Sequence, residues 1–134
     1  MSRFSEKGYF VKENAPIYLT QDMDRTARWF EEVLGWYSNI VERDSSGRGQ
    51  YGVAFDIPPE VEATHLAPFT GFQMFAGKPT GHEISFMQVH GIEELHKHVT
   101  GKGWDEITPV ETQPWGGKVC RIATVDGYII RIFE

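Results

Sequence analysis

The first half of the chain contains an apolar stripe with the spacing of an α-helix. Its members follow one another at steps of four, three and four residues, which places them on one helical face: Met23, Ala27, Phe30 and Leu34. Asp22 directly precedes the stripe and can cap the helix N-terminus with its carboxylate. Gly35 directly follows the stripe, as a C-terminal stop should. These signals predict a helix between Asp22 and Gly35.

Short runs of apolar and β-branched residues on either side of this helix predict strands. The first run, residues 15–20, precedes the helix, and three more follow it at residues 36–42, 50–57 and 69–75. A turn-rich segment joins the second of these strands to the third, and residues 58–68 are expected to form a polar loop. This half of the chain is therefore predicted to run strand, helix and three strands.

The second half repeats this order. A strand is expected at residues 84–89, and a helix follows it with its own apolar stripe: Ile92, Leu95 and Val99. Gly101 and Gly103 end this helix, and three strands are expected after it: residues 106–110, 118–124 and 128–133. Gly35 and Gly103 are each followed by tryptophan, and they lie 103 − 35 = 68 residues apart, about half of the chain.

A unit of one helix and four strands buries only one face when it stands alone, so the two halves are expected to pack into one domain. We therefore predict an α+β domain built from two copies of a unit that runs strand, helix and three strands. Module one spans about residues 15–76 and module two about 82–134, within a single domain of residues 15–134. Residues 1–14 are expected to form an N-terminal arm that packs down on this domain or adds an edge strand.

Composition and charge narrow the partners. The chain has 134 residues, with 13 basic and 19 acidic side chains, so its formal charge is −6 and its pI is about 5.3. Nucleic acids and anionic membranes both need a basic patch, so neither is expected as a direct partner. The start of the chain lacks a signal peptide and no stretch is long enough to span a membrane, so a cytoplasmic protein is predicted.

Two features of the sequence contain residue types found in catalytic or metal sites, but each is better explained as ordinary structure. Cys120 is the only cysteine, and its place in a strand-like run favours a small buried apolar group over a nucleophile. The segment from His90 to His98 is rich in histidine and glutamate, but its alternating charges are typical of a solvated helix face. Neither feature predicts a metal or catalytic site.

Two segments resemble signatures of a known family. Residues 22–36 look like the first-helix signature of the vicinal oxygen chelate superfamily. Residues 113–117 and 125–134 are similar to its closing hairpin of proline, tryptophan and glycine followed by aspartate and glycine. This superfamily includes glyoxalase I, bleomycin and fosfomycin resistance proteins, and extradiol dioxygenases. The resemblance implies an α+β fold in which paired βαβββ modules form two curved mixed sheets around a cavity, which is usually completed in a homodimer.

Metal-dependent members of this superfamily hold a divalent ion with ligands from four strands. Carried over by counting, these positions fall on an amide, two hydrocarbon side chains and a guanidinium: Gln73, Ala15, Ile84 and Arg131. Only Gln73 could coordinate a metal, because a guanidinium repels a cation. We therefore expect no metal and no cofactor. If the register of this strand were shifted by one residue, Glu83 would take the ligand position in place of Ile84. His82 lies two residues from Ile84 and would share its face of the strand, but a site of His82 or Glu83 with Gln73 would still lack its other ligands.

The same positions suggest how a ligand would be held. An inward-facing Arg131 would offer a fixed positive charge to an anionic ligand, whereas the alternative is a strand arginine paired with a surface carboxylate or at a dimer contact. Other candidates would line the pocket, orient the ligand or stack on a flat ring: Ile84, Gln73, Gln88, Trp115, Tyr51, Trp36 and Trp104. For the tryptophans and Tyr51, ordinary packing in the core or an interface is the alternative.

These considerations predict a homodimeric protein that binds a small organic ligand, anionic or aromatic, in a metal-free cavity. Binding would serve sequestration or sensing. The alternative is an enzyme of the glyoxalase and dioxygenase superfamily, with lyase or isomerase chemistry at a non-standard site. A third hypothesis is a sensing domain that works with a separate DNA-binding protein, since the chain has no basic helix of its own.

Overall fold

The computed structural model describes residues 4–57 and 70–134. The predicted loop at 58–68 and the first residue of the predicted strand at 69–75 lie outside the described residues. The first half forms one helix and four strands, in this order: β1 (Ile17–Thr20), α2 (Met23–Leu34), β2 (Tyr37–Arg43), β3 (Gly49–Phe55) and β4 (Gly71–Ala76). The strands form sheet A in the order β1-β4-β3-β2, with β1 parallel to β4 and the other pairs antiparallel.

The second half has the same arrangement. Its elements follow in this order: β5 (Glu83–Gln88), α4 (Ile92–Gly101), β6 (Glu111–Thr112), β7 (Lys118–Ala123) and β8 (Ile129–Phe133). They form sheet B in the order β5-β8-β7-β6, and β5 is parallel to β8 as β1 is to β4. The predicted α+β fold of two βαβββ modules is therefore confirmed.

The strand predicted at residues 106–110 is wrong. Ile107 makes only an isolated bridge to Ile122, and the regular pairing with β7 is confined to β6, at Glu111 and Thr112. The Arg121 N–H donates to the side-chain Oγ1 of Thr108 at 2.8 Å in place of the Thr108 carbonyl, and the pairing has shifted by one residue at Glu111, so no regular ladder runs through the predicted segment.

Local signals fix both ends of α2. The carboxylate of Asp22 accepts a hydrogen bond from the Arg25 N–H at 3.1 Å, which caps the helix as predicted. Gly35 adopts a left-handed conformation with φ of 72°, and its N–H donates to the Glu31 carbonyl. Residues with a Cβ rarely adopt this φ, so glycine ends the helix at little cost.

The N-terminus of α4 is capped by the last residue of the chain. Gly91 precedes the helix and has no side chain to cap it. The Glu134 carboxylate instead accepts hydrogen bonds from the N–H groups of Gly91 at 2.8 Å and Ile92 at 3.0 Å. These bonds lower the pKa of Glu134, because they favour its charged form.

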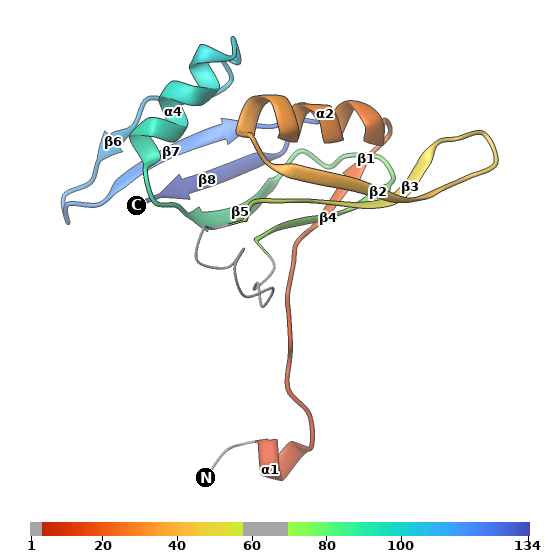
Figure 1. Ribbon diagram of the computed structural model, residues 1–134. Helices are drawn as coiled ribbons and strands as arrows, with labels where there is room; N and C mark the ends of the chain where they lie inside the picture. Colours follow the sequence, from red (N-terminus) through yellow and green to blue (C-terminus); the bar gives the residue numbers. More distant parts are fainter. Residues whose placement is uncertain (1–3, 58–69) are drawn as a thin grey trace.

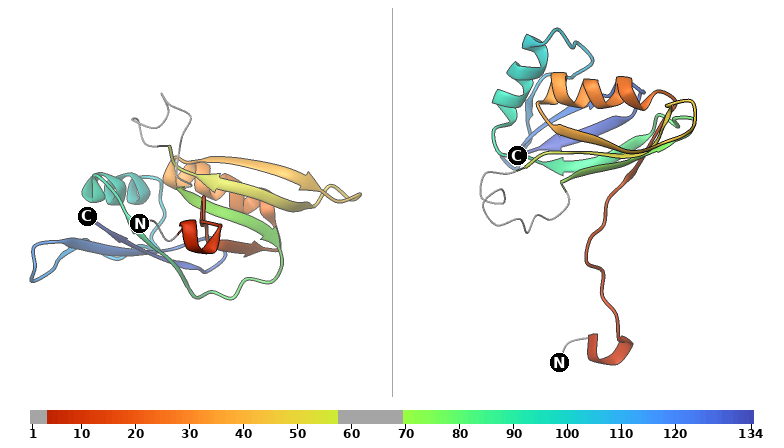
Figure 2. Two further views of the ribbon diagram at one scale, coloured as in Figure 1. Left: turned by 90° about the horizontal axis from the view of Figure 1, so that it is seen from below. Right: turned by 45° about the vertical axis from the view of Figure 1, so that its right-hand side comes forward.

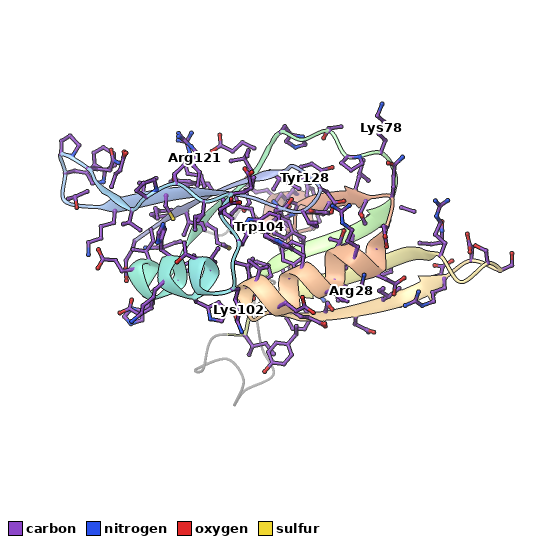
Figure 3. All side chains as sticks on the ribbon, turned by 90° about the horizontal axis from the view of Figure 1, so that it is seen from above. Arg28, Lys78, Lys102, Trp104, Arg121 and Tyr128 are labelled. Atoms are coloured by element: carbon purple, nitrogen blue, oxygen red, sulfur yellow. The ribbon has the colours of Figure 1, made fainter. Side chains whose placement is uncertain are left out.

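The core lies where the helices meet the sheets. Figure 1 shows α2 and α4 on the same side of both sheets, and the two helices contact each other. Figure 3 shows Trp104 and Tyr128 among the side chains that fill this region. The fully buried members come from both halves of the chain: Tyr18, Phe30, Met74, Ile92, Val99, Ile122, Tyr128, Ile130 and Ile132. Burying one such side chain contributes about 1.5 to 3 kcal/mol.

A buried polar cluster joins the two halves. The Asp126 carboxylate, from the turn before β8, accepts hydrogen bonds from Tyr18 Oη at 2.7 Å, Thr26 Oγ1 at 2.6 Å and Thr20 Oγ1 at 3.2 Å. All three donors belong to the first half and are essentially inaccessible to solvent. Asp126 therefore ties β1 and α2 to sheet B.

The N-terminal segment runs away from the domain. After the short helix α1 (Phe4–Lys7), residues 8–16 lead to β1 from the side of the sheets opposite to α2 and α4 (Figures 1 and 2). Tyr9 and Val11 are 64% and 72% exposed. Within the described residues, the arm adds no strand to either sheet. None of the described helices is long and apolar enough to cross a membrane.

Candidate functional site

The face of sheet B that the helices leave uncovered carries an ordered grid of side chains. Ile130 and Ile132 of β8 point into the core, so the alternate residues of β8 point to the open face. Register pairing across β5, β8 and β7 gives three rows on this face: Gln88–Phe133–Val119, Phe86–Arg131–Arg121 and Glu83–Ile129–Ala123. Arg131 therefore lies at the centre of the grid.

Arg131 is held by Glu83. Its Nε donates to Glu83 Oε1 at 2.6 Å, and its Nη2 donates to Oε2 at 3.3 Å. Both side chains are about 40% exposed (38% and 43%), so screening limits the pair to about 0.2 to 1 kcal/mol. The Nη1 group makes no hydrogen bond within the described part of the chain and can donate to a ligand.

A shallow depression surrounds this ion pair. It has a volume of about 400 Å³ and is open to solvent, and its lining comes from β5 and β8: Glu83, Ile84, Ser85, Phe86 and Arg131. Phe86 is 64% exposed, and its ring stacks on Phe133 with 4.2 Å between centroids and 13° between planes. The depression therefore joins a charged group to an exposed aromatic surface.

The alternative register at Glu83 and Ile84 is decided by a bulge. Glu83 pairs with Ile129 and Ser85 pairs with Ile130, so the two strands lose register between Glu83 and Ser85. Ile84 packs partly against the core while still lining the depression. Glu83 is thereby left on the open face beside Arg131.

The open face of sheet A is apolar and aromatic. Gln73 lies on it between Ile17 and Val53, which are its neighbours on β1 and β3. Tyr51 lies on the same face, and its ring centroid is 5.0 Å from that of Phe75. Gln73 and Tyr51 are thus neighbours on sheet A, whereas Arg131 and Ile84 belong to sheet B.

The remaining predicted residues are scattered. Gln88 is exposed and shares the open face of sheet B with Phe133. Trp115 is 76% exposed in the turn between β6 and β7 and does not line the depression. Trp36 is buried in the core, and Trp104 packs against the core. Ordinary packing, and not contact with a ligand, therefore accounts for these two residues.

The sequence analysis missed Phe86, Phe133 and Arg121. The alternation Ile129, Arg131, Phe133 in the last strand could have placed Phe133 on the face of Arg131. No such signal exists for Phe86 or Arg121, because their position beside Arg131 depends on strand register between distant segments.

The residues at the four positions implied by the resemblance do not fit a divalent cation. Gln73 offers one amide oxygen, Ala15 and Ile84 offer no side-chain donor atom, and Arg131 holds a positive charge that is paired with Glu83. Within residues 4–57 and 70–134, no three His, Cys, Asp or Glu side chains are grouped to hold a metal ion.

Cys120 is a core residue, as predicted. It is 1% exposed, and burial raises the pKa of its thiol to about 11. A thiol with this pKa is almost entirely protonated near neutral pH, so it is a poor nucleophile.

Both the sequence and the fold of this chain are similar to those of known proteins. Residues 15–77 match the model of the bleomycin resistance protein domain. No curated protein sequence matches the chain. A glyoxalase-related enzyme from Clostridium phytofermentans is 51% identical, with a TM-score of 0.86 over 96% of this chain and 98% of that one.

More distant structures share the fold alone. A bleomycin-binding protein, solved in complex with bleomycin, is 18% identical, with a TM-score of 0.65 over 91% of this chain and 97% of that one. A member of the glyoxalase/bleomycin resistance protein/dioxygenase superfamily from Sphaerobacter thermophilus is 19% identical, with a TM-score of 0.65 over 93% and 98% of the two chains.

Proposed function

Since the chain belongs to the vicinal oxygen chelate superfamily of glyoxalase-related and bleomycin resistance proteins, we propose that it binds a small organic ligand without a metal ion. Binding would serve sequestration or sensing. One observation carries this proposal. An arginine, Arg131, takes the central place on the open face of sheet B, where it lines a depression of about 400 Å³ beside an exposed aromatic pair.

The site chemistry supports binding over metal-assisted catalysis. A Lewis acid would need several oxygen or nitrogen donors directed at one point, and Arg131 supplies only hydrogen-bond donors and a positive charge. The 18%-identical relative solved with bleomycin supports the idea that this fold can hold an organic molecule. Which ligand the present chain binds depends on the side chains of its own open sheet faces.

The second candidate function is catalysis, and it is favoured by the relative from Clostridium phytofermentans. That protein is described as a glyoxalase-related enzyme, and its identity of 51% extends over nearly the whole chain. Lyase or isomerase chemistry at a non-standard site would then use Glu83 as the nearest general base in the depression. Turnover of a glutathione hemithioacetal by the purified protein would favour this candidate.

We further propose that the protein is a cytoplasmic homodimer. The open apolar face of sheet A and an arm with exposed Tyr9 and Val11 support a second copy as the partner. Among these exposed groups are also Ile17 of β1 and Tyr37 of β2. The free, buried thiol of Cys120 suits a reducing compartment. Light scattering of the purified protein measures the mass, and a single-chain mass at all concentrations would refute the dimer.

A ligand screen tests the binding proposal. Thermal shift of the wild type against aromatic acids, antibiotics and glutathione conjugates should find compounds that raise its melting temperature. Arg131→Ala should weaken the response to the compounds that bind, whereas Arg28→Ala, on the exposed face of α2, should leave it unchanged (Figure 3). Elemental analysis should find no stoichiometric transition metal. A bound metal ion, or no thermal shift with any compound, would refute the proposal.

A further inference from the structure

Arg131 has a second guanidinium beside it. Arg121 of β7 pairs in register with Arg131 of β8, so the two side chains lie on the same open face with Cα atoms about 4.5 to 5.5 Å apart. Like charges opposite each other on antiparallel strands destabilise the sheet. In a protein with a formal charge of −6, this pairing concentrates positive charge where the fold gains nothing from it.

The carboxylates nearby compensate only one of these charges. Glu83 hydrogen-bonds Arg131, and no hydrogen bond or ion pair joins Glu83 to Arg121 in the described part of the chain. Glu111 is in register with Val119, one row away from Arg121. Arg121 is exposed, and its side chain makes no hydrogen bond or ion pair with the described residues. In Figure 3 it lies on the side of sheet B away from the helices. Among the described residues, the two guanidiniums therefore carry one positive charge that no ion pair compensates.

An aromatic surface lies on the other side of Arg131. Phe86 of β5 is in register with Arg131, so one row across the sheet reads aromatic ring, guanidinium, guanidinium. Phe86 stacks on Phe133, which enlarges the aromatic surface. Two strand spacings, about 10 Å, separate Phe86 from Arg121. A fused aromatic ring with one carboxylate fits this span.

We propose that Arg121 and Arg131 form an anion subsite and that the ligand is an aromatic acid. This inference rests on the proposed function and names its ligand class. The ring of the ligand lies against Phe86 and Phe133, and its acid group lies between the two guanidiniums. Arg131 donates from Nη1, because Glu83 occupies its Nε and Nη2. Arg121 is the residue that distinguishes an acid from a neutral analogue.

Glu83 has a defined effect in this arrangement. Its carboxylate stands close to the place of the ligand's acid group and repels it, while it also holds the Arg131 side chain in position. Neutralising Glu83 should therefore strengthen the binding of an acid, which is the opposite of the effect expected from damage to the site.

Calorimetric titration with 2-naphthoate and its neutral analogue 2-naphthamide tests the inference. The wild type should bind the acid more tightly than the amide, and added salt should weaken only the acid. Arg121→Gln should weaken the acid about tenfold, as expected for one charge-assisted contact, and leave the amide unchanged. Glu83→Gln should strengthen the acid several-fold. Arg28→Gln is the control of matched charge, and circular dichroism confirms that each variant folds.

The outcomes distinguish failure of this inference from failure of the proposed ligand-binding function. Equal affinity of the wild type for acid and amide, or an unchanged affinity of Arg121→Gln for the acid, would overturn the anion subsite and leave ligand binding intact. Failure of 2-naphthoate to bind would overturn the aromatic-acid inference as well. The proposed function would then depend on the remaining classes in the thermal-shift screen, and it would fall only if none of them bound.

Discussion

Asp126→Ala should destabilise the protein by about 3 kcal/mol, because it removes the acceptor that joins the two halves. The carboxylate accepts close hydrogen bonds from Tyr18 at 2.7 Å and Thr26 at 2.6 Å, and a longer one from Thr20 at 3.2 Å. Hydrogen bonds to a charged group contribute about 1.5 to 3 kcal/mol each. Burial raises the pKa of Tyr18 well above its usual value, so its hydroxyl stays protonated as a donor.

The expected loss is smaller than the sum of three bonds because all three donors have other partners. The Thr20 and Thr26 hydroxyls lie 2.8 Å from each other. The Tyr18 hydroxyl also lies 2.7 Å from Thr124 Oγ1, and the Thr26 hydroxyl lies 3.2 Å from the Asp22 carbonyl. Two strong bonds at the low end of the range give about 3 kcal/mol. Asp126→Asn keeps one acceptor oxygen and should lose about half as much.

Urea unfolding followed by tryptophan fluorescence measures this free energy. The exposed Asp105→Ala variant is the control for the loss of one negative charge, and it should stay within about 0.5 kcal/mol of the wild type. Tyr18→Phe combined with Asp126→Ala should cost less than the two single changes added together, because both remove the same bond. A loss below 1 kcal/mol for Asp126→Ala, or strict additivity in the double variant, would refute the reasoning.

Two further predictions concern the ends and the interior of the second half. Glu134→Gln should lower the melting temperature at neutral pH, because the lowered pKa of Glu134 means that its charged form stabilises the fold. This stabilisation is present above the ordinary carboxyl pKa of about 4.3 and is lost as the pH falls through the lower pKa of Glu134 in the folded protein. The melting temperatures of wild type and variant should therefore converge in acid. A difference that stays constant with pH would refute the role of the charge. Cys120 should react with a thiol reagent only after unfolding, since burial raises the pKa of its thiol to about 11. The rate of labelling at neutral pH measures this, and rapid labelling of the native protein would contradict it.

The sequence by itself determined the elements and their order. Helix α2 follows from a stripe of apolar residues between Asp22 and Gly35, and these signals act within a few residues of the backbone that they shape. The repeated order of strands and helix is equally visible, because the apolar runs and the glycine stops recur in both halves. Residues 106–110 show the limit of this reasoning, since a run of suitable composition fails as a strand when the Thr108 hydroxyl takes the place of a carbonyl in the ladder.

Only the tertiary structure decided which side chains share a face. In β8 both sets of alternate residues contain isoleucine, so the pattern alone does not tell which side the helices cover and which side carries Arg131. The bulge in β5 leaves Glu83 beside Arg131, and long-range register brings Phe86 and Arg121 to its two sides. Hydrogen bonds between strands distant in the chain set that register, so the grid around Arg131 exists only once the sheet has formed.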